Sequence, residues 1–377
     1  MSTLGFVAIV KDEATVIERC LDSVLPLVDY VLISDTGSSD GTPGVIARWL
    51  EAHGIPGQVI ERPWRNFADN RNEAIEALRQ VPGVDYALTI DADEYLVYEP
   101  DFDPIAFKRD LAAADAYRVM TWHGDNRYRR MQIFSNRLPF RYKDVLHAYL
   151  VAPKGARIAS AQGFHDHYTH DGARAKDPQK FHKNAAILER ELTTATDPGD
   201  IARYTFYLAQ SYRDAGVPDK ARDNFFKRAG MGLWQEEVCL SWLYAGHAME
   251  KLGQLPELRL SVYLKAYEAG PHRAETLYAA ARTCRAMKSY HHGYLLAKTG
   301  IELAEPDTLF VDSSVYRWRM LDEFQLCAYW SGHIDEAVEA SERLLSEAKF
   351  PEEQRERIEA NAAYALAKFD ELNGPID

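Results

Sequence analysis

The chain has 377 residues, of which 46% are hydrophobic and 27% charged, a composition typical of a globular protein with two or three domains. Its 44 basic and 57 acidic residues give a net charge of −13, which argues against general binding of nucleic acid or anionic membranes, although a local basic groove would escape that average. Cys20, Cys239, Cys284 and Cys327 are far apart and form no C-x-x-C motif, so neither a zinc site nor a disulfide framework is expected.

The N-terminus and the apolar segments predict a cytoplasmic protein. A strand is expected from Leu4 to Val10, with no basic leader or cleavage site before it. No apolar stretch approaches the roughly 20 residues that span a bilayer, so no membrane span is expected. Scattered thiols suit a reducing compartment.

The first third of the chain alternates between strand and helix patterns. Strands are predicted over 4–10, 30–33, 58–61 and 86–90, and helices over 14–24, 43–53 and 69–78. Thr42 is the expected N-cap of the second helix, with Pro43 as its first residue and Gly54 beyond its end. Repeated β-α-β units predict a mostly parallel sheet with right-handed crossovers.

The pattern changes after residue 115. Residues 116–122, 131–134 and 148–151 are predicted strands with few helices between them, which indicates an antiparallel flank. The polar, His-rich segment 159–180 is interpreted as a long loop. From Phe181 onward every periodic segment is helical, which divides the chain into domains 1–180 and 181–377.

The helical half contains a weak repeat. The small–aromatic–glycine–alanine spacing of a tetratricopeptide helix pair is met by Leu208, Ala209, Tyr212, Gly216, Ala221, Phe225 and Ala229. A shift of 37 residues (253 − 216) places Gly253 opposite Gly216 and Ala266 opposite Ala229. Because small residues let paired helices approach closely, we predict degenerate tetratricopeptide-like stacking. An irregular helical bundle is the competing interpretation.

Acidic and glycine-rich segments follow the predicted strands of the first third. They are Lys11-Asp12-Glu13, the run 35–42, Asp69-Asn70-Arg71-Asn72 and Asp91-Ala92-Asp93-Glu94. The carboxyl ends of parallel strands share one edge of the sheet, where open α/β folds bind ligands. Two adjacent carboxylates repel unless a cation relieves them, and their oxygens suit magnesium or manganese. An isolated D-x-D is more often a solvated acidic turn, but four coinciding segments favour a site for nucleotide phosphates and metal.

In this order, V-K-D-E, D-T-G-S-S-D-G-T, A-D-N-R-N and D-A-D-E resemble the nucleotide-sugar domain of glycosyltransferase family 2. Most of the chain resembles bacterial and viral members that carry tetratricopeptide repeats behind the catalytic domain. The resemblance implies a GT-A fold, an α/β Rossmann-like domain with a mostly parallel sheet, followed by an all-α tetratricopeptide-like domain. It also implies transfer of a sugar from a nucleoside diphosphate, UDP by family habit, with inversion at the anomeric carbon.

The resemblance assigns the nucleoside pocket first. Asp35 would accept hydrogen bonds from the base or ribose, with an Asx-turn role as the alternative. Asp12 and Glu13, just beyond Val10, would line the same pocket, although either residue equally suits a cap of the first helix.

The diphosphate and metal side follows from the same resemblance. Arg71 would face the diphosphate, because a planar guanidinium matches phosphate oxygens. Asp91, with Ala92, would lie toward the ribose, and Asp93 would bind Mn²⁺ or Mg²⁺. Glu94 would orient a metal ligand or a water.

A further metal ligand is expected from the histidines beyond the sheet. His167 and His170 are the candidates, the latter in an H-x-G context that resembles the family. Solvated, inert histidines are the alternative. Arg174 and Lys176 follow them and suit a lid over the phosphates.

Inversion needs a base for the acceptor proton, or an acceptor acidic enough without one. Relatives often carry a His-Glu pair after a short aromatic strand, but here Ala148 occupies the Glu position. Asp144 and His147 are therefore the candidate catalytic residues, with Asp125 as a further candidate. The same departure leaves open a catalytically inactive, transferase-like scaffold that binds partners through its repeats.

The expected partners are a nucleotide-sugar donor and an unidentified acceptor, which is a protein, a glycan or a modified nucleobase. The helical half would recognise the acceptor or form a homodimer. Arg127, Arg129, Arg130 and Arg137 are the residues that a basic cleft for nucleic acid would use. A nucleotidyltransferase also places acids at sheet ends, but the Gly-rich, Lys-bearing signature expected for one is missing near the first turn.

Overall fold

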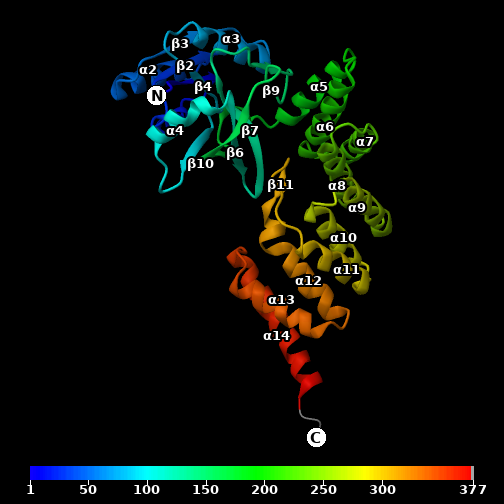
Figure 1. Cartoon of the computed structure of the whole chain (residues 1–377). Helices are drawn as coiled ribbons and strands as arrows, with labels where there is room; N and C mark the ends of the chain where they lie inside the picture. Colours follow the sequence, from blue (N-terminus) through cyan, green and yellow to red (C-terminus); the bar gives the residue numbers. More distant parts are fainter. Residues whose placement is uncertain (375–377) are drawn as a thin grey trace. The chain divides into compact units, whose positions relative to one another are not determined.

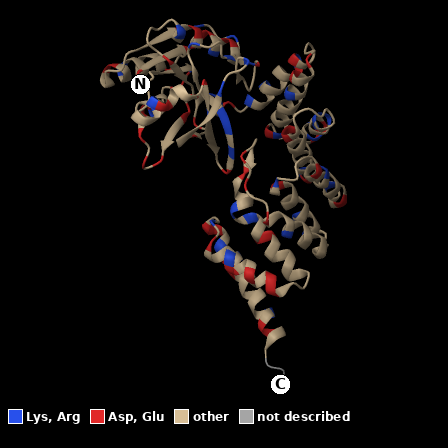
Figure 2. Ribbon diagram, viewed as in Figure 1, with Lys and Arg blue, Asp and Glu red and all other residues tan. Residues whose placement is uncertain are grey.

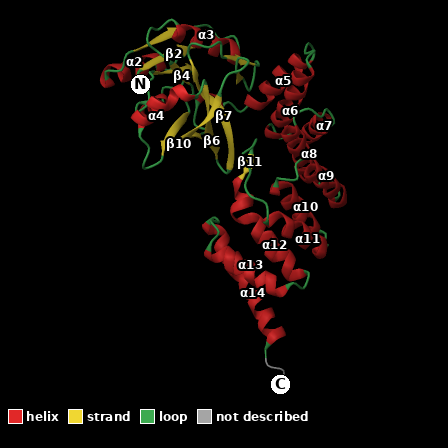
Figure 3. Ribbon diagram, in the orientation of Figure 1, coloured by secondary structure: helices red, strands yellow, loops and turns green. Residues whose placement is uncertain are grey.

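The computed structural model describes residues 1–374 and divides into two compact units, Met1–Lys180 and Phe181–Asp377 (Figure 1). Figure 3 shows strands gathered in the first unit and helices filling the second. The expected order, an α/β domain followed by a helical domain, is therefore confirmed.

The first unit is built on one mixed sheet with the strand order β3-β2-β1-β4-β7-β6-β10-β5. The strands are β1 (Leu4–Val10), β2 (Tyr30–Asp35), β3 (Gly57–Glu61), β4 (Tyr86–Leu88), β5 (Glu94–Tyr98), β6 (Ala116–His123), β7 (Asn126–Ser135) and β10 (Ile158–Tyr168). The first four are mutually parallel, β7 is antiparallel to both β4 and β6, β10 is parallel to β6, and β5 is antiparallel to β10. The predicted parallel sheet and its antiparallel flank are both present.

Helices cover both faces of this sheet. They are α1 (Ile17–Val24), α2 (Thr42–His53), α3 (Phe67–Arg79) and α4 (Pro104–Asp110), with short 3₁₀ turns at Leu111–Ala113 and Ala173–Lys176. Residues of α1 and α2 pack with one face of β1, whereas residues of α3 pack with the other face. A strand that is buried on both faces has a continuous run of apolar residues, which is why β1 could be predicted from the sequence. A separate hairpin, β8 (Arg141–Lys143) and β9 (Tyr149–Val151), packs beside α3.

The predicted loop at 159–180 is wrong, because its first part is the long strand β10. His165 and His167 are partly exposed on one face of the strand, whereas Phe164 and Asp166 are buried on the other. Gly163 has a positive φ of 85°, and the register shifts around it, which interrupts the alternation. In the sequence, the charged Asp166 favours a loop, but in the structure it is buried in the sheet and paired with Arg130.

The second unit is a succession of helices, each packed on the next from α6 to α14. They are α5 (Lys180–Leu192), α6 (Pro198–Asp214), α7 (Pro218–Ala229), α8 (Gln235–Lys251), α9 (Pro256–Ala269), α10 (Ala274–Ala286), α11 (Tyr290–Ile301), α12 (Met320–Trp330), α13 (Ile334–Ser346) and α14 (Arg355–Asn373). Short elements lie at Val311–Asp312 (β11), Val315–Arg319 (a π-helix) and Glu352–Gln354 (a 3₁₀ turn).

The small residues of the predicted repeat lie where the helices turn or touch. Gly216 and Gly253 follow α6 and α8 with positive φ values of 74° and 64°. Gly246 permits the close contact between α8 and α9, since a Cβ there would stand 2.2 Å from the ring of Tyr263. Among residues 1–374, no helix combines the length and the apolar composition that crossing a membrane requires.

Candidate active site

The loops that follow β1 and β2 are joined by hydrogen bonds at the carboxyl edge of the sheet. Val10 O accepts hydrogen bonds from Thr36 N (2.9 Å) and Thr36 Oγ1 (3.0 Å). Asp12 N donates to Ser38 Oγ (2.8 Å), and Asp12 Oδ1 accepts from Ser39 N (2.6 Å). Asp12 thereby holds the glycine-rich turn in place.

Asp35, at the end of β2, combines a turn role with an acceptor atom that no described residue satisfies. Its Oδ2 accepts hydrogen bonds from Gly37 N (3.1 Å) and Ser38 N (3.0 Å), which is an Asx-type turn. The residue is only 5% exposed, yet Oδ1 has no hydrogen-bond partner among residues 1–374. Buried acceptors are normally satisfied, so Oδ1 is an acceptor that the described residues leave without a donor.

Asp91 follows β4 and is paired with a guanidinium. Arg71 on α3 donates to Asp91 Oδ1 and lies over the ring of Tyr142, 5.1 Å from its centroid. Burial disfavours the charged form of Asp91, but the charges of Arg71 and Arg130 outweigh burial and hold its pKa below the ordinary value. Arg71, which was expected to face a diphosphate, neutralises Asp91 in this structure.

The neighbouring carboxylates are less well compensated. Burial and the charge of Asp91 raise the pKa of Asp93 to about 6. Burial, then the charges of Asp93 and Asp91, raise the pKa of Glu13 to about 7, against the hydrogen bond that Ala173 N donates to its Oε2 (3.1 Å). Glu13, Asp91 and Asp93 therefore share one region of negative potential, in which a cation would be favoured.

A polar network lies beneath this region. Glu94 Oε2 accepts from Asp91 N (2.8 Å), and its Oε1 accepts from Arg130 Nη2 (2.7 Å). Arg130 also donates to Asp166 Oδ2, to which Gln132 Nε2 donates as well (2.8 Å). Through Arg130, the D-x-D turn is tied to β10.

His170 lies beyond β10 in a segment that touches Asp93. A Cβ built on Gly172 would stand 2.6 Å from Asp93 Oδ2. Only glycine at position 172 therefore lets this segment lie so close to the carboxylate. The Nε2 atoms of His170 and His123 are 2.7 Å apart. His123 is a neighbour of His170 that only the folded sheet reveals.

His167 has a different environment. It belongs to β10, on the opposite face of the strand from Asp166, and its ring lies 4.9 Å from that of Tyr95. Within residues 1–374, no group of three or more His, Cys, Asp or Glu side chains is assembled closely enough to hold a metal ion.

Asp144 and His147 lie in the connection between β8 and β9. Their φ values are 78° and 52°, and Asp12 has a φ of 58°. These three are the non-glycine residues with positive φ in the described part of the first unit, and all are predicted site residues. Positive φ is uncommon outside glycine, although Asp and His adopt it more readily than most residues. Asp144 is buried and His147 is exposed.

Two of the four arginines considered for a basic cleft are paired with carboxylates in the structure. Figure 2 marks basic residues along β7, but neighbouring residues of a strand point to opposite faces. Arg130 turns inward to Glu94 and Asp166, and Arg137 pairs with Asp85.

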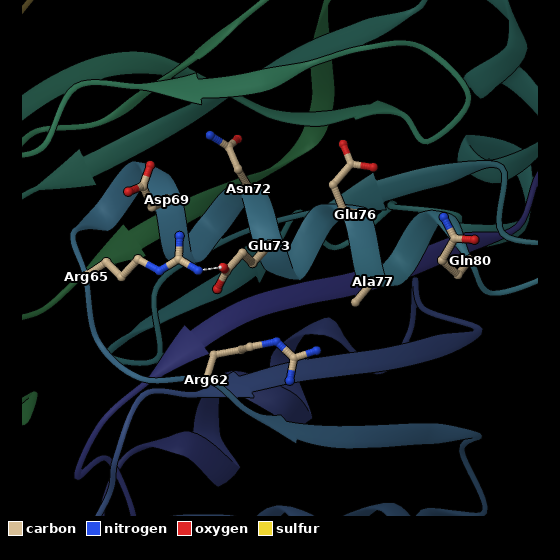
Figure 4. A pocket seen from close by; sticks show the side chains of 8 residues that line it. All are labelled: Arg62, Arg65, Asp69, Asn72, Glu73, Glu76, Ala77 and Gln80. Atoms are coloured by element: carbon tan, nitrogen blue, oxygen red, sulfur yellow. Dashed lines mark hydrogen bonds and ion pairs between the residues drawn. The ribbon is translucent and has the colours of Figure 1, made fainter.

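An open pocket of about 520 Å³ lies beside α3, separate from these carboxylates. Figure 4 shows the side chains that line it, which are Arg62, Arg65, Asp69, Asn72, Glu73, Glu76, Ala77 and Gln80. Its charges are mixed, and Arg65 is paired with Glu73. The pocket includes none of Asp35, Asp91 and Asp93.

Comparisons with known proteins place the N-terminal unit in a family. Residues 6–146 match the model of glycosyl transferase family 2. A TPR repeat-containing protein of Synechococcus elongatus is 32% identical over 152 residues, which are 39% of this chain and 35% of that protein. A lipopolysaccharide core biosynthesis glycosyltransferase of Rhizobium meliloti is 31% identical over 92 residues, 24% of this chain and 32% of that protein.

Among solved structures, MamA is similar with a TM-score of 0.37 and 16% identity, over 50% of this chain and 99% of that chain. This chain spans about a third of the length of the curated relatives named above. The motifs quoted from the sequence, the sheet that gathers them at one edge and the match over 6–146 agree, and residues 6–146 thus form a glycosyl transferase family 2 domain.

Proposed function

We propose that this protein is a metal-dependent, inverting glycosyltransferase that transfers a sugar from a nucleoside diphosphate sugar, UDP-linked by family habit. One observation carries the proposal: inside a family 2 domain, the unpartnered Oδ1 of buried Asp35 belongs to the same sheet edge as Glu13, Asp91 and Asp93. An acceptor for nucleoside groups and a region that attracts a cation are the two features that a nucleotide diphosphate requires.

The nucleoside would bind first through Asp35, with the loop of Val10, Asp12 and Glu13 beside it. Asp12 and the turn after β2 would form a rigid wall of the nucleoside pocket, because the hydrogen bonds between them are already present without a ligand. Asp91 and Ala92 would lie on the ribose side.

The residues present suit a divalent ion. Glu13 and Asp93 are half-buried carboxylates whose pKa values are raised first by burial and then by the charges of neighbouring carboxylates. Carboxylate oxygens are ligands that suit Mn²⁺ or Mg²⁺. Asp93 and His170 are the proposed ligands, and His167, whose ring lies by that of Tyr95, is the second histidine candidate. When bound, such an ion neutralises charge on the departing diphosphate. Arg71 can exchange Asp91 for phosphate oxygens, since a guanidinium matches both.

The acceptor proton would be taken by Asp144 or His147. The connection that carries them adjoins the donor side, because Tyr142 of β8 lies under Arg71 and Asn72 exchanges hydrogen bonds with the Tyr142 backbone (2.7 and 2.9 Å). The helical unit would recognise the acceptor or form a homodimer, since stacked helix pairs offer extended surfaces. Its three buried free cysteines, with Cys20 in the first unit, support a reducing, cytoplasmic location.

The test is a screen of nucleotide sugars for release of the nucleoside diphosphate with and without Mn²⁺. We expect metal-dependent hydrolysis with one donor class and its loss in Asp93→Ala. Asp85→Asn should keep the hydrolysis, because Asp85 precedes β4, whereas Asp91 and Asp93 follow that strand, and it pairs with Arg137. The active donor would then label the acceptor in a lysate of the source. No release from any donor, together with no binding of UDP or another nucleoside diphosphate, would contradict the proposal.

Ala148 in the Glu position favours one second candidate, a transferase-like scaffold without turnover. Binding of a donor without hydrolysis or transfer would identify it.

A further inference from the structure

The segment 169–173 is attached to two separate parts of the first unit, the D-x-D turn and the loop after β1. Thr169 Oγ1 donates to the carbonyl oxygen of Asp93, Gly172 packs against the Asp93 side chain, and Ala173 N donates to Glu13. This segment carries His170, and it brings that residue to the D-x-D turn.

Arg19 of α1 joins these attachments. Its Nη1 lies 2.6 Å from Asp171 Oδ2 and its Nη2 lies 2.9 Å from Asp171 Oδ1, a two-pronged pair. The same Nη2 is 3.2 Å from the carbonyl oxygen of Asp93 and 3.2 Å from Thr169 Oγ1. One guanidinium thus binds the His170 segment and the backbone of the D-x-D turn together.

Stability alone does not account for this arrangement. The two side chains are 37% and 47% exposed, and exposed ion pairs contribute little to the free energy of folding. Geometry is the better explanation, because Arg19 is held over the ring of Tyr95, 5.1 Å from its centroid, and all its acceptors belong to the two segments that carry Asp93 and His170. Partners that orient metal ligands in this way have large effects on metal affinity.

We propose that Arg19 and Asp171 form a positioning pair that holds the His170 segment on the D-x-D turn and so sets the affinity for the divalent ion. The proposal rests on the metal-dependent transfer proposed above, and it adds two residues that touch neither the donor nor the metal. Arg19→Gln and Asp171→Asn would release the segment without removing a ligand.

The experiment uses the full chain in four forms: wild type, Arg19→Gln, Asp171→Asn and the exchange Arg19→Asp/Asp171→Arg. Arg109→Gln is the matched control, because Arg109 forms an exposed pair with Asp110 elsewhere in the same unit. For each form, the Mn²⁺ concentration at half-maximal donor hydrolysis, the melting temperature and the amide hydrogen exchange of 169–173 are measured.

In the single variants we expect the half-saturating Mn²⁺ concentration to rise about tenfold. Exchange of 169–173 should become faster, with the melting temperature close to that of wild type. The exchange variant should recover part of the Mn²⁺ affinity, because it restores the attraction, and Arg109→Gln should behave as wild type.

Two results distinguish failure of the positioning pair from failure of the proposed function. If wild type hydrolyses a donor but the single variants keep its Mn²⁺ dependence and its exchange rates, the positioning pair is refuted and the proposed function stands. If wild type hydrolyses no donor while exchange of 169–173 still rises in both single variants alone, the proposed function fails and the structural pair remains. Faster exchange in Arg109→Gln as well would also refute the pair, since the effect would not be specific.

Discussion

Gly172 lies against the side chain of Asp93 so closely that a Cβ at position 172 would stand 2.6 Å from Asp93 Oδ2 and 2.9 Å from its Cβ. The φ of Gly172 is −65°, which any residue adopts, so space rather than backbone conformation requires glycine here. The H-x-G context is therefore a packing requirement of the D-x-D turn.

Substitution Gly172→Ala should push the Asp93 carboxylate away from its position. We expect the Mn²⁺ requirement of donor hydrolysis to rise about tenfold while the fold is retained. Metal titration of activity and a thermal melt check this. Gly44→Ala is the control, because its Cβ would meet only the end of Arg48 at 3.5 Å. An unchanged metal requirement in Gly172→Ala would show that Asp93 is free to move without consequence.

Substitution Asp35→Asn should weaken nucleotide binding. The change keeps the size of the side chain but removes the charge and one acceptor, and a hydrogen bond to a charged group contributes about 1.5–3 kcal/mol. We expect the Kd for UDP to rise at least about tenfold, with the melting temperature of the free protein little changed. Isothermal titration calorimetry measures this directly. Equal affinities in the two proteins would exclude Oδ1 as a ligand of the nucleoside.

Arg130 should be the residue of the first unit whose loss is most destabilising. Glu94 and Asp166 are fully buried, and Arg130 is paired with both. Arg130→Gln leaves two buried carboxylates without a counter-charge, which lowers the free energy of unfolding by about 3 kcal/mol. Urea denaturation with a probe in this unit checks the value. The double variant Arg130→Gln/Asp166→Asn should be more stable than the single variant, and a further loss instead would contradict the pairing.

The helical unit should lose stability as the pH falls below neutrality. Burial, with the charges of Arg282, Arg213 and Arg319, lowers the pKa of His247 to about 4, against the opposing charge of Glu250. The unfolded chain binds this proton near pH 6.5. The stabilisation is therefore complete above pH 6.5 and is lost progressively between pH 6.5 and 4.

Thermal melts across that pH range test the effect by comparing variants. His247→Leu should reduce the slope of melting temperature against pH, whereas His291→Gln, on the exposed surface of α11, should leave the slope as in wild type. If both variants show the wild-type slope, other groups dominate acid unfolding of this unit.

Local patterns made much of the fold readable from the sequence. β1 is an unbroken apolar run because both of its faces are buried, and the segments around Asp35 and Asp91 stand out because charge follows each such strand directly. Parallel strands end at one edge, so the gathering of these acids follows from strand order alone. The helix repeat is likewise local, since Gly216 and Gly253 end helices where a positive φ is needed.

Other features depended on partners far along the chain. The strand β10 was not predicted because a charged residue such as Asp166 is not expected at a buried strand position. Its charge is compensated there by Arg130, which lies 36 residues away in the sequence. Arg71 was assigned to phosphate, but its proximity to Asp91 is decided by how α3 packs on the sheet.

By itself, then, the sequence determined the two-part architecture, the family of its N-terminal part and the acids of one sheet edge. These features depend on the spacing of apolar residues within each element and on the order of the elements along the chain, and both can be read from neighbouring residues. Only the tertiary structure decided which charges neutralise one another and which segment covers Asp93. Arg19 and Asp171 are 152 residues apart, and nothing in either local context encodes their contact. Such contacts arise from the packing of α1 and the path of the chain after β10, which are set by the whole sheet.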